Sequence, residues 1–460
     1  MTEHDTEDVD LLVIGGGKAG KSLAMDRAKA GWSVAMVERD KIGGTCINVA
    51  CIPTKALVGS ARALLTARHA EALGVTVDGP VSATIDVLRH HKEDVVGGMV
   101  NAHRKLFADS GMDFVMGTAT FVASRTVEIP LDDGDRRRIR GRDVVVNTGT
   151  TPAKPPLEGI DEAGVWDSET ILRLEELPRS MVVLGGGYVG CEFASMFAVF
   201  GTRVTLLQGG DQVLTREDPD IASEVAGVLR EQGVDVRLGS RVHAVRRDSS
   251  GELVVALADG SQARADQLLC ATGRTPVTAE LGLDATGVET DDRGFVVVDD
   301  HLRTTADHVW AAGDVAGSPQ FTHASWNDFR ILKQNLTGSD AVTTGRLIPY
   351  TVFTTPELGR VGLTETEARM QGHRVRVAKI PAAAIPRSKT LHLATGSWKA
   401  VVDADSEQIL GVALLGHDAG EVIAAVQMAM LGGLRYQQVR DAPITHPTMA
   451  EGLNLLLDAL

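Results

Sequence analysis

The sequence has few of the residues on which secreted and membrane proteins depend. Its 460 residues include only 4 cysteines, and aromatic residues make up 4% of the chain. So few cysteines exclude a secreted protein stapled by disulfides, and the closely spaced pair Cys46 and Cys51 therefore favours a chemical role. No apolar run approaches the roughly twenty residues that cross a membrane, and residues 1–10 are acidic and polar, unlike a signal peptide. We expect a cytoplasmic protein that does not bind membranes.

An excess of positive charge is also missing. A formal net charge of -15 at pH 7 opposes attraction to nucleic acid or anionic lipid. A short basic run, residues 136–138, lies in a stretch rich in Gly and Asp, which predicts a solvated hairpin tip. A zinc site needs four ligands, and the Cys46/Cys51 pair has no second Cys/His pair nearby, so we assign no metal ligands. The other two cysteines, Cys191 and Cys270, are expected to be small buried hydrophobic side chains.

Two stretches of the chain carry the pattern of a dinucleotide-binding βαβ unit. Residues 11–38 and 181–208 each show an apolar strand, a glycine turn, a helix and a second strand. The glycines allow a tight turn and let the backbone approach a pyrophosphate at the helix N-terminus. They are Gly15, Gly17 and Gly20 in the first stretch and Gly185, Gly187 and Gly190 in the second. One such turn can be merely structural, whereas two in full context predict two Rossmann-like domains in an α/β protein of three or four domains.

Several further segments surround these units. Glu38, at the end of the first unit, can bond a ribose hydroxyl. Apolar strands are predicted over residues 144–146, 268–270 and 309–311, and they are followed by Thr148 and Gly149, by Gly273 and Arg274, and by Gly313 and Asp314. Asp314 lies just past a strand end, where ligands sit in parallel sheets, although an Asp at that place can also cap a helix.

Beyond residue 345 the pattern changes to alternating strands. Residues 374–380, 397–402 and 409–415 predict strands, and residues 421–430 predict an apolar helix. This part carries no nucleotide motif. The sequence therefore predicts a separate C-terminal α+β module.

The stretch of residues 43–55, Gly-Gly-Thr-Cys-Ile-Asn-Val-Ala-Cys-Ile-Pro-Thr-Lys, follows the first βαβ unit directly. It closely resembles the redox signature of the class I pyridine nucleotide-disulfide oxidoreductases, which include dihydrolipoamide dehydrogenase, glutathione reductase and mercuric reductase. The resemblance extends from about residue 8 to the C-terminus. It implies an enzyme that binds FAD in the first unit and NAD(P)H in the second, and that passes two electrons through the flavin to the Cys46/Cys51 disulfide.

The resemblance also implies roles for individual side chains. Cys51 is the thiol that faces the flavin and forms a charge-transfer thiolate, and Cys46 is the interchange thiol that attacks the substrate. Lys55 and Glu192 match a buried ion pair near the reactive flavin nitrogen. Tyr188 matches the aromatic gate over the nicotinamide pocket.

Residues 445–451, Thr-His-Pro-Thr-Met-Ala-Glu, resemble the family's C-terminal catalytic segment. There His446 is a general acid/base, oriented by Glu451 and donated to the other subunit of a homodimer. A leaving thiolate needs a proton, and imidazole titrates near neutral pH. The cofactor-binding residues predicted from the motifs and the resemblance together are Gly15, Gly17, Gly20, Glu38, Thr45, Lys55, Thr148, Gly149, Gly185, Gly187, Gly190, Gln208, Gly273, Arg274, Gly313, Asp314, Thr322 and Ala324.

By the same resemblance the chain divides into four parts. They are an FAD-binding part with the redox disulfide over residues 1–150, an NAD(P)-binding domain over 151–275, a central domain that completes the FAD site over 276–345, and a dimerisation domain over 346–460.

Departures from the family's patterns narrow the choice of member. No cysteine follows Cys270, whereas mercuric reductase carries a C-terminal cysteine pair. The residues before His446 lack the second histidine of dihydrolipoamide dehydrogenase, which remains the alternative function. Segments 17–21, 321–322, 328–331, 352–356 and 383–387 are similar to a mercuric-reductase-like subgroup of bacterial reactive-chlorine-resistance reductases, linked to copper(II) and oxidant defence. The expected oxidant is a small-molecule disulfide, a metal ion or another oxidant. A flavoprotein without redox activity is disfavoured, since Cys46, Cys51 and His446 are all present.

The choice of nucleotide depends on the end of the second βαβ unit. An acid there is typical of NAD enzymes and nearby arginines are typical of NADP enzymes, but this chain has Gln208. Gly190, where NADP enzymes often carry alanine, and Asp211, which would repel a phosphate, favour NAD. We expect both nucleotides to work, with NADH modestly better.

Overall fold

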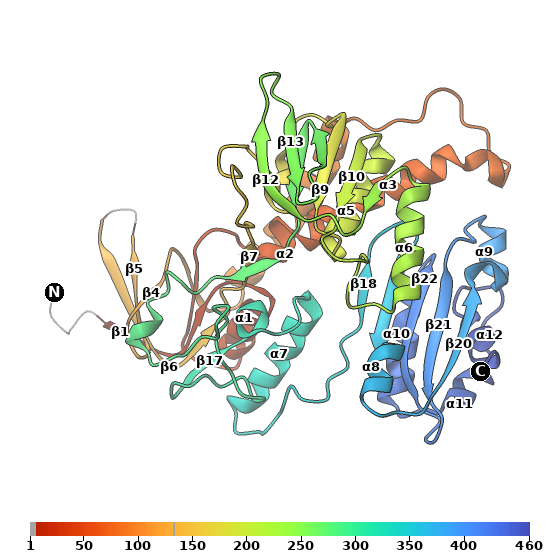
Figure 1. Cartoon of the computed structure of the whole chain (residues 1–460). Coiled ribbons are helices and arrows are strands. Elements are labelled where there is room, and N and C mark those ends of the chain that lie inside the picture. The colour runs from red at the N-terminus through yellow and green to blue at the C-terminus, as the bar shows by residue number, and fades with distance from the viewer. Residues whose placement is uncertain (1–5, 132–133) are drawn as a thin grey trace. The chain divides into compact units, whose positions relative to one another are not determined.

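The computed structural model describes residues 6–131 and 134–460, and it divides the chain into two compact units (Figure 1). Each unit is assembled from three separated segments of the chain. The first unit contains the residues up to Thr54, His90–Ala153 and Gly273–Arg346, and the second contains Lys55–Arg89, Lys154–Thr272 and Leu347–Leu460.

A parallel sheet forms the centre of the first unit. Its parallel strands lie in the order β3 (Asp113–Met116), β2 (Val34–Glu38), β1 (Thr6–Ile14) and β6 (Arg136–Val146), and β17 (Val309–Ala311) pairs with the end of β6. Strands β5 (Thr126–Pro130) and β4 (Thr120–Ala123) extend the same sheet from the start of β6 by antiparallel pairing. Strands that are covered on both faces need apolar side chains throughout, and the run from Leu11 to Ile14 is fully buried. The predicted strand–turn–helix–strand pattern of residues 11–38 is confirmed.

Helices and short strands complete the first unit. Helix α1 (Lys18–Lys29) follows β1 and packs against α7 (Thr322–Asn335). Further elements are α2 (Thr45–Asn48), β7 (Thr150–Pro152), β16 (Arg274–Pro276), η4 (Leu283–Ala285) and η5 (Gly313–Ala316). The chain passes from the first unit to the second after Thr54 and returns to the first at His90. The helices of this part are α3 (Cys51–Arg68), η2 (Ala70–Leu73) and α4 (Ile85–Ala108).

The basic run 136–138 differs from its prediction as a solvated hairpin tip. These arginines begin strand β6, which pairs with β5, and they form ion pairs with acids on neighbouring strands. Arg137, for example, donates to both Glu7 carboxylate oxygens, at 2.7 and 2.6 Å, and also contacts Asp113. Ion pairs across neighbouring strands therefore stabilise these arginines in a β-strand. Composition alone had favoured a turn.

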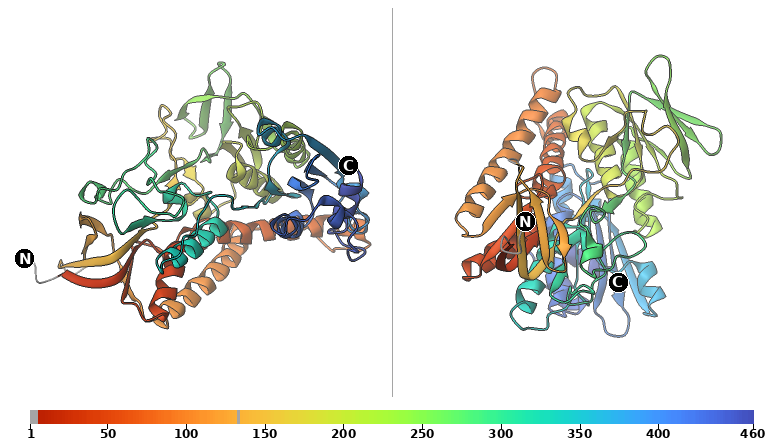
Figure 2. Two further views of the ribbon diagram at one scale, coloured as in Figure 1. Left: turned by 90° about the horizontal axis from the view of Figure 1, so that it is seen from below. Right: turned by 90° about the vertical axis from the view of Figure 1, so that its left-hand side faces the viewer.

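The second unit contains its own parallel sheet. The strand order is β11 (Asp235–Arg237), β10 (Arg203–Leu207), β9 (Ser180–Leu184), β15 (Gln267–Cys270) and β8 (Trp166–Asp167), with helices α5 (Tyr188–Phe200) and α6 (Pro219–Glu231) and the turn η3 (Thr170–Arg173). A small antiparallel sheet of β12 (Val242–Arg247), β13 (Leu253–Leu257) and β14 (Gln262–Ala265) appears in green in Figure 2. The second predicted βαβ unit is confirmed, and Cys191 and Cys270 are buried as expected.

The C-terminal part of the second unit is an antiparallel sheet. Its order is β18 (Tyr350–Val352), β19 (Glu357–Gly362), β22 (Ile409–Gly416), β21 (Ser397–Asp403) and β20 (Val375–Pro381), with α10 (Ala419–Leu431) packed on β19 and β22. Short helices α8 (Glu365–Met370), η6 (Ala382–Ala384), α9 (Pro386–Thr390), α11 (Tyr436–Arg440) and α12 (Gly452–Asp458) surround it. The predicted strands and helix beyond residue 345 are confirmed.

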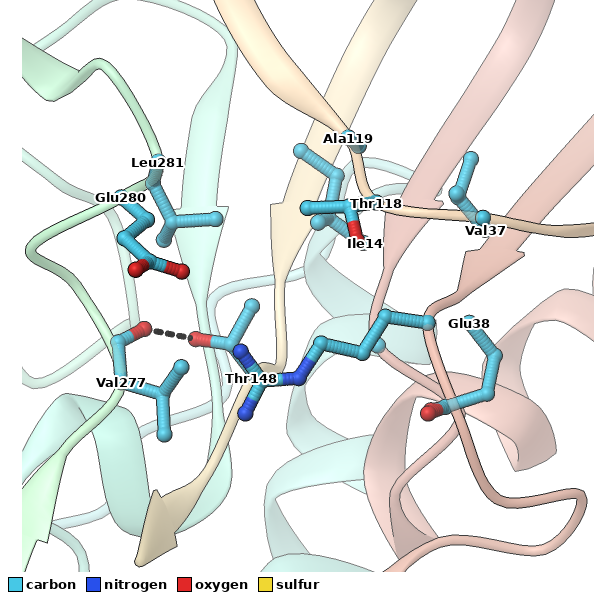
Figure 3. Close-up of a pocket in the computed structure, with 12 residues that line it drawn as sticks. Ile14, Val37, Glu38, Thr118, Ala119, Thr148, Val277, Glu280 and Leu281 are labelled. Carbon is cyan, nitrogen blue, oxygen red and sulfur yellow. Dashed lines mark hydrogen bonds between the residues drawn. The ribbon is translucent and has the colours of Figure 1, made fainter. Parts of the chain in front are cut away.

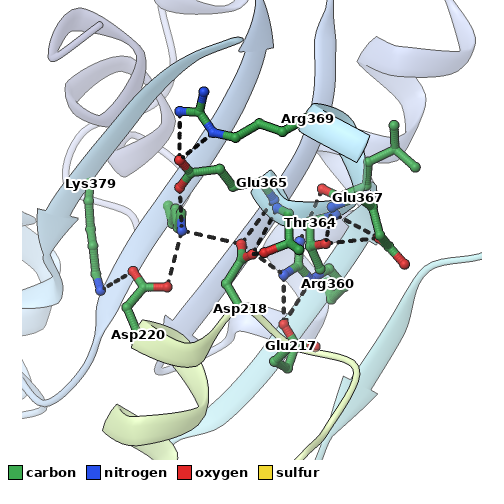
Figure 4. Close-up of polar contacts among 12 residues, drawn as sticks. Glu217, Asp218, Asp220, Arg360, Thr364, Glu365, Glu367, Arg369 and Lys379 are labelled. Carbon is green, nitrogen blue, oxygen red and sulfur yellow. Dashed lines mark hydrogen bonds and ion pairs between the residues drawn. The ribbon is translucent and has the colours of Figure 1, made fainter. Parts of the chain in front are cut away.

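A buried ion-pair network joins the start of α6 to the C-terminal sheet within the second unit (Figure 4). Arg360, on β19, donates to Glu217 Oε2 at 2.9 and 2.7 Å, and both side chains are almost completely buried. Asp218 accepts from the backbone amides of Glu365 and Thr366 at 3.0 and 3.1 Å. Because a buried charge is costly without its partner, this network fixes how the two modules pack.

In the part of the chain that the structure describes, no helix is both long and apolar enough to span a bilayer.

Candidate active site

The redox cysteines lie on a glycine loop that packs against the first glycine turn, Gly15–Gly20. Gly43 and Gly44 have φ of +92° and +77°, a left-handed conformation that side chains disfavour. A Cβ at Gly44 would come within 3.0 Å of the Gly16 carbonyl oxygen and of Gly17 Cα. The loop backbone therefore touches the glycine turn directly, and it delivers Cys46 into α2 and Cys51 to the start of α3.

Cys46 and Cys51 are hydrogen-bonded thiols in this structure and are not joined by a disulfide. A hydrogen bond to Cys51 and burial raise the pKa of Cys46, while Thr322 and Lys21 act in the opposite direction. The Cys51 sulfur also lies 3.5 Å from the Thr322 hydroxyl, at the start of α7. Cys51 is the first residue of an 18-residue helix, whose N-terminal dipole favours a thiolate. The pair can therefore hold one negative charge more easily than two.

The first glycine turn has the geometry of a pyrophosphate cradle. A Cβ at Gly15 would lie 2.3 Å from the Asn147 carbonyl oxygen, and one at Gly20 would lie 2.4 Å from the Gly15 carbonyl oxygen. Only glycine allows this close packing of turn, helix and return strand. Glu38 accepts a hydrogen bond from the Gly16 amide at 2.7 Å, so its carboxylate is held at the turn. These residues fit a bound dinucleotide at the N-terminus of α1.

A cavity opens at the carboxyl ends of β1 and β2 in the first unit (Figure 3). Ile14, Glu38 and Leu281 line it together with Thr148, whose hydroxyl donates to the Val277 carbonyl at 2.7 Å. Ligands of parallel α/β sheets bind at this edge. The cavity is therefore consistent with the FAD site that the motifs predict.

The predicted residues around Asp314 form one hydrogen-bonded group. The Thr150 hydroxyl donates to Asp314 Oδ2 at 2.8 Å, and Arg274 Nε donates to the Thr150 hydroxyl at 2.7 Å. Burial raises the pKa of Asp314. Asp328, which is fully buried, accepts from the Gly313 amide at 2.7 Å and so holds the strand end from which Asp314 projects.

The second glycine turn, Gly185–Gly190, repeats the close packing in the second unit. A Cβ at Gly190 would lie 1.8 Å from the Gly185 carbonyl oxygen, and one at Gly185 would lie 2.5 Å from the Ala271 carbonyl oxygen. Gln208 accepts from the Gly186 amide at 2.9 Å. A Cβ at Gly187 would meet nothing within 4 Å, so the space in front of α5 is open to a ligand.

Lys55 and Glu192 form an ion pair in the second unit. Lys55 Nζ lies 2.7 Å from Glu192 Oε2, and the Phe353 amide donates to the other carboxylate oxygen at 2.8 Å. Lys55 Nζ also lies 4.7 Å from the centre of the Phe353 ring. The pair is a contact in three dimensions between residues 137 positions apart in the chain.

Tyr188, the first residue of α5, is held by another aromatic ring. Its ring centre lies 5.0 Å from that of Tyr350, and the Tyr350 hydroxyl contacts the buried Glu217. Burial raises the pKa of Tyr188, so its hydroxyl stays neutral at physiological pH. The ring is thus anchored to the same network that joins α6 to the C-terminal sheet.

His446 lies near the C-terminus with a carboxylate at its side. Its Nδ1 is 2.7 Å from Glu451 Oε2, and the side chains are 70% and 12% exposed respectively. A carboxylate at Nδ1 orients the ring and leaves Nε2 free for proton transfer. The exposed ring is therefore accessible to a reacting group from outside.

Asn147, Asp328 and Lys21 support this region, although the sequence analysis gave none of them a role of its own. Asn147 accepts from the Gly20 amide at 2.8 Å and donates to the Ala312 carbonyl at 2.6 Å, which clamps the first glycine turn. Asp328 supports Gly313, and the buried Lys21 donates to the Gly43 carbonyl at 2.8 Å. A polar residue at the end of an apolar strand was a usable signal for Asn147. No sequence pattern indicated that Asp328 and Lys21, which both lie on helices, would be buried.

Comparisons with known proteins agree with these features. Residues 9–328 match the family model of the pyridine nucleotide-disulphide oxidoreductases, and residues 348–456 match that of their dimerisation domain. The chain therefore belongs to the pyridine nucleotide-disulfide oxidoreductase family. It is a flavin-dependent oxidoreductase whose cofactors are FAD and a pyridine nucleotide, NAD(P)H.

Individual relatives extend over nearly the whole chain. The probable pyridine nucleotide-disulfide oxidoreductase RclA of Escherichia coli K12 is 41% identical over 96% of this chain and 97% of its own. A mercuric reductase of Streptomyces lividans is 36% identical over 97% and 95%. The structure of a Cu(II) complex of the HOCl-induced flavoprotein disulfide reductase RclA from Escherichia coli matches with a TM-score of 0.91 at 40% identity, covering 98% of this chain and 99% of that chain. The predicted subgroup and reductase class are confirmed.

Proposed function

We propose that this enzyme is an oxidant-defence reductase in which Cys46 and Cys51 deliver two electrons from NAD(P)H to a disulfide, a metal ion or another small oxidant. The observation that carries the proposal is the adjacent cysteine pair on a loop packed against the first glycine turn. FAD held at that turn would supply the hydride-accepting chemistry that links the nicotinamide nucleotide to the cysteine pair. The names of the similar proteins, a HOCl-induced reductase and a mercuric reductase, support this choice of substrate class.

When the acceptor is a disulfide, the Cys46/Cys51 pair reduces it by two thiol–disulfide exchange steps. The Cys46 thiolate attacks one substrate sulfur, which forms a mixed disulfide and releases the first thiolate. His446 of the partner subunit gives that leaving thiolate a proton. The Cys51 thiolate then attacks the Cys46 sulfur, so the second substrate thiolate leaves and takes a proton from water, and the Cys46–Cys51 disulfide forms again. Two electrons and two protons convert one disulfide into two thiols.

The other predicted residues serve these steps as binding and orienting groups. In this proposal Glu38, Asp314 and their neighbours hold FAD, and Gly187 and Gln208 bind NAD(P)H. Lys55 and Glu192 form the ion pair at the reactive end of the flavin, and Tyr188 gates the nicotinamide pocket. The four-part division at residues 150, 275 and 345 stands as part of the same proposal. Its support is that the predicted residues gather around the two glycine turns.

Mixing two inactive variants tests the shared active site. A homodimer of Cys51→Ser subunits and one of His446→Gln subunits should each be nearly inactive. After subunit exchange, each heterodimer contains one site with both residues intact, so about a quarter of the wild-type activity should return if subunits exchange randomly and His446 acts across the dimer. No recovery after verified subunit exchange would contradict a shared site.

The acceptor is identified by anaerobic reduction followed by a screen of oxidants. Enzyme reduced with NADH is mixed with disulfides, lipoamide, quinones, Cu(II) and Hg(II), and the return of flavin absorbance is timed. We expect fast reoxidation by at least one disulfide or metal ion and slow reoxidation by lipoamide. Rapid turnover of lipoamide alone would favour the dihydrolipoamide dehydrogenase alternative.

A further inference from the structure

A buried lysine on helix α1 contacts the redox loop in the first unit. Lys21 is only 3% exposed, and its Nζ donates to the Gly43 carbonyl oxygen at 2.8 Å. Gly43 is three residues before Cys46 on the loop that carries the redox pair. The amine is therefore fixed by a hydrogen bond to the backbone of that loop.

The position of Lys21 is unfavourable for the helix that carries it. Lys18 is the first residue of α1 and Lys21 lies in its first turn, and this turn has no acidic residue. The positive end of the helix dipole repels both amines, and burial penalises the charge of Lys21 further. Burial and the neighbouring Lys18 lower the pKa of Lys21 to about 8. Stability of the helix does not explain why a lysine occupies this place.

The charged groups around Lys21 indicate which negative charge its ammonium group stabilises. Lys18 adds positive charge, whereas His103 favours its neutral form, because burial and then both lysines lower its pKa. Cys46 and Glu38 are the acidic groups that favour the charged amine. Of these two, Glu38 already accepts hydrogen bonds from three backbone amides. The Cys46 thiol is the group whose charge changes during the proposed reaction.

We propose that Lys21 is a positioning residue for the reductase: it holds the redox loop through Gly43 and stabilises the Cys46 thiolate by its positive charge. The inference rests on the proposed function, because it gives Cys46 the role of the attacking thiol. It adds a residue outside the cysteine motif to the machinery of disulfide exchange. Lys21 also lowers the pKa of Cys46, against the effects of Cys51 and burial.

The test measures the reactivity of Cys46 against pH. Holoenzyme is reduced anaerobically with one equivalent of NADH and treated with iodoacetamide between pH 6 and 10, and mass spectrometry reports the modified cysteine. Lys21→Met removes both the hydrogen bond and the charge, Lys21→Gln keeps a donor without the charge, and Lys21→Arg keeps the charge. Lys29→Met, at the exposed end of the same helix, is the matched control.

We expect Met and Gln at position 21 to slow alkylation of Cys46 about tenfold near pH 7, which corresponds to a rise of about one unit in the apparent pKa. Arg and the Lys29 control should follow wild type. If the Met variant fails to bind FAD, the Gln and Arg variants carry the comparison. Coincident profiles for wild type and Lys21→Gln would overturn the charge role.

The same measurement separates this inference from the proposed function. If reduced wild type is alkylated at Cys51 and not at Cys46, the assignment of Cys46 as the attacking thiol is wrong. If Cys46 is alkylated in wild type but position 21 does not alter its pH profile, only the role of Lys21 is wrong.

Discussion

The two glycine turns have the same backbone design and different surroundings. In both, the first glycine packs on a return strand, the third packs on the first, and the residue that ends the second strand accepts from an amide of the turn. In the first turn, however, the Asn147 side chain bonds Gly20 and Ala312 and lies 2.7 Å from where a Gly17 Cβ would be. The second turn has Ala271 at the corresponding strand end and open space at Gly187.

This difference agrees with the two cofactors. In the proposed function FAD stays bound at the first turn through the catalytic cycle, and the hydrogen bonds of Glu38 and Asn147 prepare this turn for permanent occupancy. A nicotinamide nucleotide must enter and leave at each turnover, and the more open turn suits exchange. The helices that follow differ as well, because α1 carries buried Lys21 whereas α5 carries buried Glu192.

The largest expected effect comes from breaking the cysteine pair, through which the proposed electron path runs from the cofactors of the two turns to the oxidant. Cys51→Ser should reduce turnover of the oxidant by more than about a thousandfold, because the pair can no longer form a disulfide. FAD should stay bound, since in the proposed function Gly15, Glu38 and Asp314 hold it and the Cys51 thiol does not. Absorbance spectra check both points: the reduced variant should lack the long-wavelength charge-transfer band of wild type. Retained turnover in this variant would contradict the mechanism.

Removing the positive charge of Lys55, the partner of Glu192 in the second unit, is expected to lower the stability of the protein. Lys55→Met leaves the buried Glu192 carboxylate with the Phe353 amide as its hydrogen-bond donor. We expect a loss of about 2–3 kcal/mol, below the value for a fully buried pair because the Lys55 side chain is 31% exposed. Thermal unfolding should show a lower midpoint. The Lys55→Arg control should stay close to wild type, and an unchanged midpoint in the Met variant would mean that the ion pair contributes little.

A matched pair of substitutions compares the two turns directly. Gly17→Ala places a Cβ against Asn147 Oδ1 and should disturb its buried hydrogen bonds, at a cost of about 1–2 kcal/mol and with a lower FAD content. Gly187→Ala meets open space, so it should fold normally and retain FAD while KM for NAD(P)H rises. The ratio of FAD to protein and the KM values measure both effects. Equal FAD loss in the two variants would remove the distinction between a clamped and an open turn.

The smallest expected effect is on the choice between NADH and NADPH. It is tested by a substitution in the second turn, Gln208→Glu, that makes this turn resemble the first. Wild type should use both nucleotides, with kcat/KM for NADH higher by less than about tenfold. Gln208→Glu copies Glu38 and keeps the acceptor for the Gly186 amide, but its charge repels a 2′-phosphate. We expect this variant to increase the NADH preference about fivefold further, close to 1 kcal/mol. An unchanged ratio would show that residue 208 does not face the ribose.

Much of this molecule follows from local sequence patterns. The two βαβ units and the C-terminal strands were predicted because apolar periodicity and glycine spacing are properties of short segments. The redox role of the loop with Cys46 and Cys51 was expected from the family resemblance of residues 43–55. The ion pair of Lys55 and Glu192 and the contact of His446 with Glu451 were expected only through family resemblance. The basic run 136–138 was misjudged because its acidic partners, such as Glu7 and Asp113, come from other strands.

By itself the sequence determined the fold class, the two dinucleotide motifs and the identity of the redox cysteines. Only the tertiary structure decided which polar groups support them: Asn147 clamps the first glycine turn, Asp328 fixes Gly313, and Lys21 is buried beside the redox loop. The physical reason is that burial and partner choice depend on other segments of the chain, from 15 positions away for Asp328 and Gly313 to 165 positions away for Asn147 and Ala312. Such partners leave no periodic signal in the chain, and the cost of burying a charge becomes visible only when its neighbours are in place.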